Sequence, residues 1–233
     1  MGILSSILLT PAIGALVLAL LPGRNPDVAR GIGKLVTSIV LLLTCYLLVS
    51  YDPHDAGMQF NEYFSIDPKI GSSYALGVDG LSMPLVVLTS LLTLFALLAS
   101  ADITKNVKGY NIGILLSEFG MLGVFLAQDW SLFYIFWEIT LIPLFFLIDR
   151  WGGKRRQTAS LNFVLYTMSG SVFMLVSLIA VFQYVPEHVS LMSAMTHVSE
   201  NMPKNQQIWA FIGFLIGFGV KMPIFPLHGW LPL

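Results

Sequence analysis

Charged residues are scarce in this 233-residue sequence: Asp, Glu, Lys and Arg make up 11% of it, while 56% is hydrophobic. A soluble domain has about 25% charged and about 45–50% apolar residues, so this composition excludes a soluble globular protein. The 12 Lys and Arg nearly balance the 13 Asp and Glu, which leaves no net basic charge for binding nucleic acid. The composition indicates a protein embedded in a lipid bilayer.

The sequence has a single cysteine, Cys45. One cysteine cannot form an internal disulfide, hold an iron–sulfur cluster or supply a Cys-x-x-Cys site. Dinucleotide and zinc motifs are also missing, and Gly152-Gly153-Lys154 matches only the end of a P-loop. We therefore expect neither a cofactor nor a metal in this chain, and any electron carriers in partner subunits.

Long apolar runs, by contrast, are abundant. A helix that crosses a bilayer needs about 20 mostly apolar residues, and several runs of about that length are bounded by Pro, Gly or charged residues. The sequence therefore predicts an all-α fold, a polytopic transmembrane bundle of about seven helices in a single membrane domain, 1–233. We expect these helices at 2–21, 31–50, 80–101, 109–127, 131–149, 160–183 and 207–222.

Lys and Arg are distributed unevenly over the loops between these runs. The even-numbered loops hold only Lys69 and Lys204, together with most of the acidic loop residues. Cytoplasmic loops of membrane proteins are enriched in basic residues, so we expect the N-terminus on the outer or lumenal side. The basic residues of the odd-numbered loops are Arg24, Arg30, Lys34, Lys105, Lys108, Arg150, Lys154, Arg155 and Arg156.

The long acidic loop 51–78 is expected to form a hairpin or cap on the outer surface. Asp79 follows it and precedes the third apolar run, which is the position of a helix-capping residue. Three histidines of the outer loops are expected to be solvated: His54, His188 and His197.

Once the charges of the loops and of the span ends are subtracted, three charged residues remain inside the predicted spans: Glu118, Glu138 and Lys221. Each is disfavoured there by about 2.5–3.5 kcal/mol on insertion scales. A Glu and a Lys could simply pair to join two helices, but a well-packed apolar pair is often as stable. Three such groups in one bundle favour a function, and we predict that they carry protons. Spacing shows no partner for Glu118.

The last run ends in a motif rich in glycine and proline. Pro223 and Pro226 have no N–H, which predicts a broken helix just after Lys221. The freed carbonyl groups would then need water or a cation, as at the half-helices of ion transporters; a kink that only improves packing is the alternative. His228 is a candidate proton carrier behind the break, or it caps the helix end. The glycines that allow a neighbouring helix to approach are Gly213, Gly217 and Gly219.

The fifth and sixth runs are also interrupted. Pro143 lies five residues after Glu138 and frees the carbonyl of Ile139. On the sixth run, four of five residues on one helical face are polar, and this face either lines a wetted path or makes helix–helix hydrogen bonds. Its residues are Asn162, Tyr166, Ser169, Phe173 and Ser177.

These motifs resemble the proton-translocating, antiporter-like chain 4 of respiratory complex I and its photosynthetic relative, called NdhD. The motifs that carry the resemblance are Gly77-Val78-Asp79-Gly80-Leu81-Ser82, Ala127-Gln128-Asp129 leading to Trp137-Glu138, Trp151-Gly152-Gly153-Lys154, Val220-Lys221-Met222-Pro223 and Pro226-Leu227-His228-x-Trp230-Leu231-Pro232. It implies a membrane-arm subunit of an NAD(P)H- or ferredoxin-quinone oxidoreductase, in which Glu138 and Lys221 form a proton-translocating pair. It also implies that quinone, iron–sulfur clusters and the electron donor belong to partner subunits.

The sequence departs from the family in two respects. Gly229 stands where the family often has Thr, and Leu233 where it has Asp, which is similar to the cyanobacterial variants used in carbon dioxide uptake. That likeness implies a thylakoid membrane and a CO2-hydrating peripheral partner. Family members have about fourteen helices in two inverted repeats, so this chain is expected to be the first half of a larger subunit.

Two other functions remain open at this point. A stand-alone Mrp-type cation/proton antiporter subunit would use the same buried Lys and Glu without a redox partner. A membrane anchor that recruits a carbonic-anhydrase-like protein would not need the buried charges at all.

Overall fold

The chain folds into helices joined by loops and one two-stranded sheet. The computed structural model describes residues 2–22, 25–55, 57–67, 71–185, 189–196 and 198–231. They group into two compact units: unit 1 contains Met1–Tyr63 and Leu76–Ala127, and unit 2 contains Phe64–Ala75 and Gln128–Leu233. Several residues named above lie outside the described residues: Arg24, Lys69, His188, His197 and Leu233.

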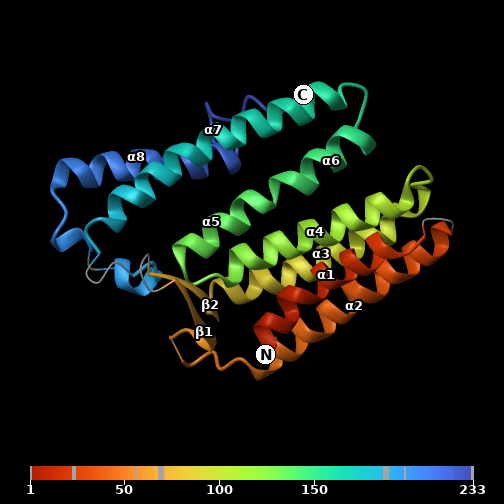
Figure 1. The fold of residues 1–233 in the computed structure, drawn as a ribbon, viewed down its shortest axis with the longest axis horizontal. Coiled ribbons are helices and arrows are strands. Elements are labelled where there is room, and N and C mark those ends of the chain that lie inside the picture. The colour runs from red at the N-terminus through yellow and green to blue at the C-terminus, as the bar shows by residue number, and fades with distance from the viewer. Residues whose placement is uncertain are drawn as a thin grey trace. The chain divides into compact units, whose positions relative to one another are not determined.

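Unit 1 contains four long helices (Figure 1): α1 (Ile3–Leu20), α2 (Pro26–Ser50), α3 (Ser82–Ala99) and α4 (Val107–Leu126). A short 3-10 turn, η1 (Ser100–Asp102), follows α3. Helix α1 packs against α2 and α4, and α3 packs against the same two helices. Leu18 and Leu115 are fully or almost fully buried in the core between them, because apolar residues recur on the facing sides of these helices.

Unit 2 also contains four helices: α5 (Trp130–Ile139), α6 (Leu141–Trp151), α7 (Arg156–Phe182) and α8 (Lys204–Lys221). Helix α7 packs against both α6 and α8. The described residues between α7 and α8 include the 3-10 turns η3 (Met192–Met195) and η4 (Val198–Glu200). The segment 51–78 contains β1 (Gln59–Asp67) and β2 (Ser72–Val78), which pair as the expected hairpin.

Six helical segments among the described residues are long and apolar enough to cross a membrane. They agree with the first six predicted spans, with α5 and α6 counted together. The fifth span is divided at Thr140, because Pro143 cannot donate a hydrogen bond to the carbonyl of Ile139. Helix α8, the seventh predicted span, is not among the six. It has 18 residues, but its first turn, 204–207, consists of Lys, Asn and two Gln.

Glycines bring α7 and α8 close together, as the sequence predicts. A Cβ atom on Gly213 would lie 2.0 Å from Oγ of Ser177, and one on Gly217 would lie 2.6 Å from Cβ of Met174. Only glycine leaves room for α7 at these two positions. The close approach fixes the end of α8, which carries Lys221.

Acidic side chains cap the first turns of α1 and α3 in unit 1. Oδ1 of Asp79 accepts a hydrogen bond from the N–H of Ser82 (2.7 Å), which confirms Asp79 as the predicted cap. This hydrogen bond holds the pKa of Asp79 below its ordinary value. Glu62 of β1 caps α1 in a similar way, since its Oε1 accepts from the N–H groups of Leu4 (2.7 Å) and Ser5 (3.1 Å). Carboxylates are favourable at helix N-termini because of the helix dipole.

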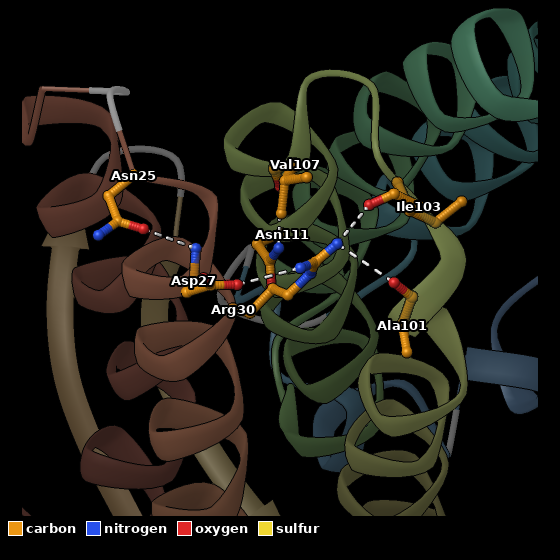
Figure 2. A network of polar contacts seen from close by, with 7 residues as sticks. All are labelled: Asn25, Asp27, Arg30, Ala101, Ile103, Val107 and Asn111. Carbon is orange, nitrogen blue, oxygen red and sulfur yellow. Dashed lines mark hydrogen bonds and ion pairs between the residues drawn. The ribbon is translucent and has the colours of Figure 1, made fainter.

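Arg30 of α2 forms hydrogen bonds with the segment that follows α3 (Figure 2). Its guanidinium donates hydrogen bonds to the carbonyls of Ala101 (3.2 Å) and Ile103 (2.8 Å). It also pairs with Asp27 at 3.2 Å, while Oδ1 of Asn25 caps the start of α2. Arginine therefore satisfies backbone acceptors that the end of a helix leaves unpaired.

Lys108 donates hydrogen bonds to carbonyl groups at the end of α1. Its Nζ donates to the carbonyls of Ala19 (2.9 Å) and Leu21 (2.7 Å). Two of the basic residues predicted on the cytoplasmic side thus also stabilise helix ends in unit 1.

Replacing Arg30 by Gln is expected to destabilise unit 1 by about 1–3 kcal/mol, because charged donors are removed from carbonyl acceptors. Asp27→Asn is the matched control. The side chain of Asp27 is 84% exposed, and an exposed ion pair contributes about 0–1 kcal/mol. Thermal unfolding of the purified protein measures both, and equal melting temperatures for the two variants would contradict this role of Arg30.

Candidate functional site

The site in unit 2 begins with a buried aspartate. Asp129 is 0% exposed and precedes α5. Its Oδ1 accepts hydrogen bonds from the N–H groups of Ser131 (2.8 Å) and Leu132 (3.1 Å), and its Oδ2 accepts from the N–H (2.9 Å) and hydroxyl (2.7 Å) of Ser73 and from the hydroxyl of Ser190. One carboxylate thus connects β2, the start of α5 and the loop before η3.

In the sequence, Asp129 stands out only as part of the family motif Ala127-Gln128-Asp129, and not as a structural residue. The signal was present, because an Asp directly before an apolar run is a typical helix cap. Its further bonds to Ser73 and Ser190 join positions 56 and 61 residues away, and spacing along a chain does not reveal such contacts.

Lys221 is the last residue of α8, so the predicted end of the helix at this position is confirmed. Its Nζ donates hydrogen bonds to the carbonyl of Trp137 (2.8 Å) and to Oγ1 of Thr140 (2.9 Å). Nζ also lies 3.9 Å from the centre of the Trp137 ring. The ammonium group therefore sits at the C-terminal end of α5, where the helix dipole is negative.

Glu138 is next to Trp137 on α5, and its charge acts on Lys221. No nitrogen–oxygen contact of 4.0 Å or less joins these two residues in the described part of the chain. Oε1 of Glu138 is buried without a hydrogen-bond partner there. Tyr134, one turn earlier, interacts with Glu138 and with Ser171 of α7. The structure thus brings Glu138 and Lys221 into one site without a direct ion pair.

A cavity of about 480 Å³ lies beside Glu138, between α6 and α7. Glu138 is the only charged residue among those that line it. The others are Leu141, Ile142, Phe145, Leu161, Val164, Leu165 and Met168.

Residues after Lys221 donate hydrogen bonds to two of the last carbonyl groups of α8. The N–H of Ile224 donates to the carbonyl of Gly219 (2.9 Å), and Nε1 of Trp230 donates to the carbonyl of Val220 (2.8 Å). The expectation that the carbonyl freed by Pro223 needs water or a cation is therefore wrong for Gly219. The reason is that the turn after the break folds back and supplies its own N–H groups.

His228 lies in this turn. Its Nδ1 is buried without a hydrogen-bond partner among the described residues, and its ring centre is 5.5 Å from that of Phe225. His228 thus keeps one ring nitrogen available to a proton.

Glu118 belongs to α4 in unit 1 and is described apart from this site. It is 0% exposed, and neither carboxylate oxygen has a hydrogen-bond partner in the described part of the chain. A carboxyl group buried in this way is unfavourable unless a proton or water reaches it.

The polar face predicted on α7 is partly buried and partly exposed. Ser177 is buried against Gly213, whereas Tyr166 and Phe173 are about half exposed. The hydroxyl of Ser169 donates to the carbonyl of Leu165 in its own helix (2.7 Å), not to another helix.

Comparison with known proteins identifies relatives of the chain. Residues 127–233 match the family model described as NADH:quinone oxidoreductase/Mrp antiporter, TM. The chain is 42% identical over 224 residues to NAD(P)H-quinone oxidoreductase chain 4 1 of Picosynechococcus sp., which covers 95% of this chain and 41% of that protein. It is 36% identical over 230 residues to chain 4-1 of Synechocystis sp., covering 98% and 43%. The chain therefore spans less than half the length of these curated relatives.

Solved structures give the same result for the fold. A chain of respiratory complex I from Thermus thermophilus with bound NADH has a TM-score of 0.85 and 29% identity, covering 98% of this chain and 46% of that chain. A chain of the Mrp complex from Dietzia sp. has a TM-score of 0.80 at 19% identity, covering 97% and 25%, which shows the fold alone. The predicted antiporter-like membrane fold is confirmed. The chain is therefore similar over nearly its whole length to part of NAD(P)H-quinone oxidoreductase chain 4, and its residues 127–233 match the NADH:quinone oxidoreductase/Mrp antiporter family.

Proposed function

We propose that this chain moves protons across a membrane as one subunit of a larger quinone oxidoreductase. The observation that carries the proposal is the buried ammonium group of Lys221, which lies at the end of α8 and contacts the end of α5 beside Glu138. Ionisable groups inside a membrane protein are rare and mark ion or proton pathways. The relatives are named as chains of NAD(P)H-quinone oxidoreductases. We therefore infer that partner subunits carry out the redox chemistry.

The proton is carried by the Lys221 amine in this proposal. The protonated amine is held by neutral groups, and Glu138 offers a negative charge close by. The attraction between two charges rises steeply as they approach in a medium of low dielectric constant, so a small displacement changes how firmly the proton is bound. On release, the proton leaves Nζ of Lys221 for water or the free ring nitrogen of His228, and another proton reloads the amine from the opposite side.

Glu118 is proposed as a proton relay within unit 1, because its buried carboxyl group has no hydrogen-bond partner among the described residues. This chain binds no redox cofactor in the proposal. Quinone, iron–sulfur clusters and the electron donor are expected in the partner subunits of the membrane and peripheral arms.

The carbon dioxide uptake form, in a cyanobacterial thylakoid membrane with a CO2-hydrating partner, is a finer proposal. It is supported by Gly229, which stands where the wider family often has Thr. A Cβ atom on Gly229 would lie 3.0 Å from the hydroxyl of Tyr166. Tyr166 and Gly229 therefore fit together, and a Thr at 229 would require Tyr166 to move.

The test is proton movement in closed vesicles that hold the assembled complex. We expect protons to move when an electron donor and quinone are added, and not when a sodium gradient is applied without them. Sodium-driven proton flux in the absence of donor and quinone would instead support an Mrp-type antiporter. Quinone reduction with no proton movement would overturn the proposal and favour a membrane anchor.

A further inference from the structure

We propose that the hydroxyl of Thr140 and the carbonyl of Trp137 form a second holding site for the Lys221 ammonium group, separate from the Glu138 carboxylate. Thr140 is then a positioning residue that sets how readily Lys221 approaches Glu138. This inference rests on the proposed function, since it concerns the same proton carrier.

The three groups form a closed set of hydrogen bonds. Nζ of Lys221 donates to the carbonyl of Trp137 (2.8 Å) and to Oγ1 of Thr140 (2.9 Å). The hydroxyl of Thr140 donates in turn to the same carbonyl of Trp137 (2.8 Å). An ammonium group only donates, and a hydroxyl both donates and accepts. Each group thus acts in the role that its chemistry allows.

The surroundings favour a positive charge without neutralising it. The last carbonyls of a helix lack intrahelical partners and carry the negative end of its dipole. The face of the Trp137 ring, 3.9 Å from Nζ, adds a cation–π attraction. Thr140 is only 4% exposed, so little water competes with its hydroxyl for the ammonium group.

The Glu138 carboxylate, the other possible holder, does not contact the ammonium group. Among the described residues its Oε1 is buried without a hydrogen bond, and it lines the apolar cavity beside α6 and α7. The lysine therefore contacts a neutral holder, formed by Trp137 and Thr140. The neighbouring charged residue, Glu138, is not in contact with it. A change in Thr140 must shift the balance between them.

Thr140→Val is the direct test, because valine has the same shape but no hydroxyl. It should be made in the full-length chain and assayed in the assembled complex, with the initial rate of proton movement and the amount of assembled complex both measured. A hydrogen bond to a charged group is worth about tenfold or more in an equilibrium. We therefore expect several-fold slower proton pumping in T140V, with normal assembly, because Lys221 stays longer with Glu138.

Two further variants separate positioning from structure. Thr140→Ser keeps the hydroxyl and is expected to pump at close to the original rate. Thr167→Val is the matched control: Thr167 is equally buried, but its hydroxyl donates only to carbonyls of its own helix, at 2.6 and 3.2 Å. Its pumping rate is expected to be unchanged.

The outcomes are decisive for the inference. Normal pumping by T140V, or equal loss in T140V and T140S, would overturn it, and the proposed function would stand if Lys221→Met still abolished pumping. Normal pumping by K221M would instead overturn the proposed function itself.

Discussion

Lys221→Met is expected to abolish proton pumping by the assembled complex while leaving the fold intact. Methionine has nearly the length of lysine but cannot bind a proton. After the substitution, the hydroxyl of Thr140 still donates to the carbonyl of Trp137, so no new unpaired donor is created. Loss of one partner from a buried ion pair is strongly destabilising, but among the described residues Lys221 forms no direct ion pair with Glu138 that the substitution could break. The loss of pumping would therefore not be explained by unfolding.

The measurement is proton movement driven by donor and quinone, together with the melting temperature of the complex. Lys108→Met provides a matched control, because Lys108 also donates two hydrogen bonds to carbonyls at a helix end but lies in unit 1, apart from the site. We expect K108M to pump normally and to be modestly less stable. Pumping by K221M at the original rate would contradict the role of Lys221.

Asp129→Asn is expected to have the largest effect on stability. The carboxylate accepts five hydrogen bonds from three segments of the chain. An asparagine amide has one acceptor oxygen in place of the two carboxylate oxygens. At least two donors would then face an NH2 group, and each buried donor left unpaired costs about 1–3 kcal/mol. We expect a loss of about 2–5 kcal/mol and a reduced amount of assembled complex in membranes.

Asp79→Asn is the control for this second prediction. Asp79 caps α3 but is only partly buried, and Asn caps helices nearly as well as Asp, so we expect a small change in melting temperature. Ser73→Ala should fall between the two, since it removes one hydroxyl donor and keeps the N–H. Equal melting temperatures for D129N and D79N would contradict the structural role of Asp129.

Most of the fold followed from composition and the spacing of apolar runs. The helices end within a few residues of the predicted positions because Pro, Gly and capping residues mark them: Asp79 precedes and caps α3, and Pro223 follows the end of α8. The seventh predicted span, 207–222, omits the polar residues 204–206 with which α8 begins, and the complete helix is not among the six membrane-length apolar segments of the described residues.

The residues of the site were harder to predict than the fold. Glu138, Lys221 and His228 stood out because a charge or a histidine in an apolar run is unusual. Thr140 and Asp129 did not, since Thr and Asp are ordinary at helix boundaries. Their roles depend on contacts with residues 81 and 61 positions away, which only the folded chain brings together.

The central claim is that Glu138 and Lys221 act together to carry a proton. The ratio of protons moved to electrons transferred in vesicles holding the Glu138→Gln complex tests it most directly, with Glu62→Gln as a control that changes a capping carboxylate. We expect E138Q to assemble and to move few or no protons per electron, while E62Q keeps the original ratio. An unchanged ratio in a fully assembled E138Q complex would contradict the account.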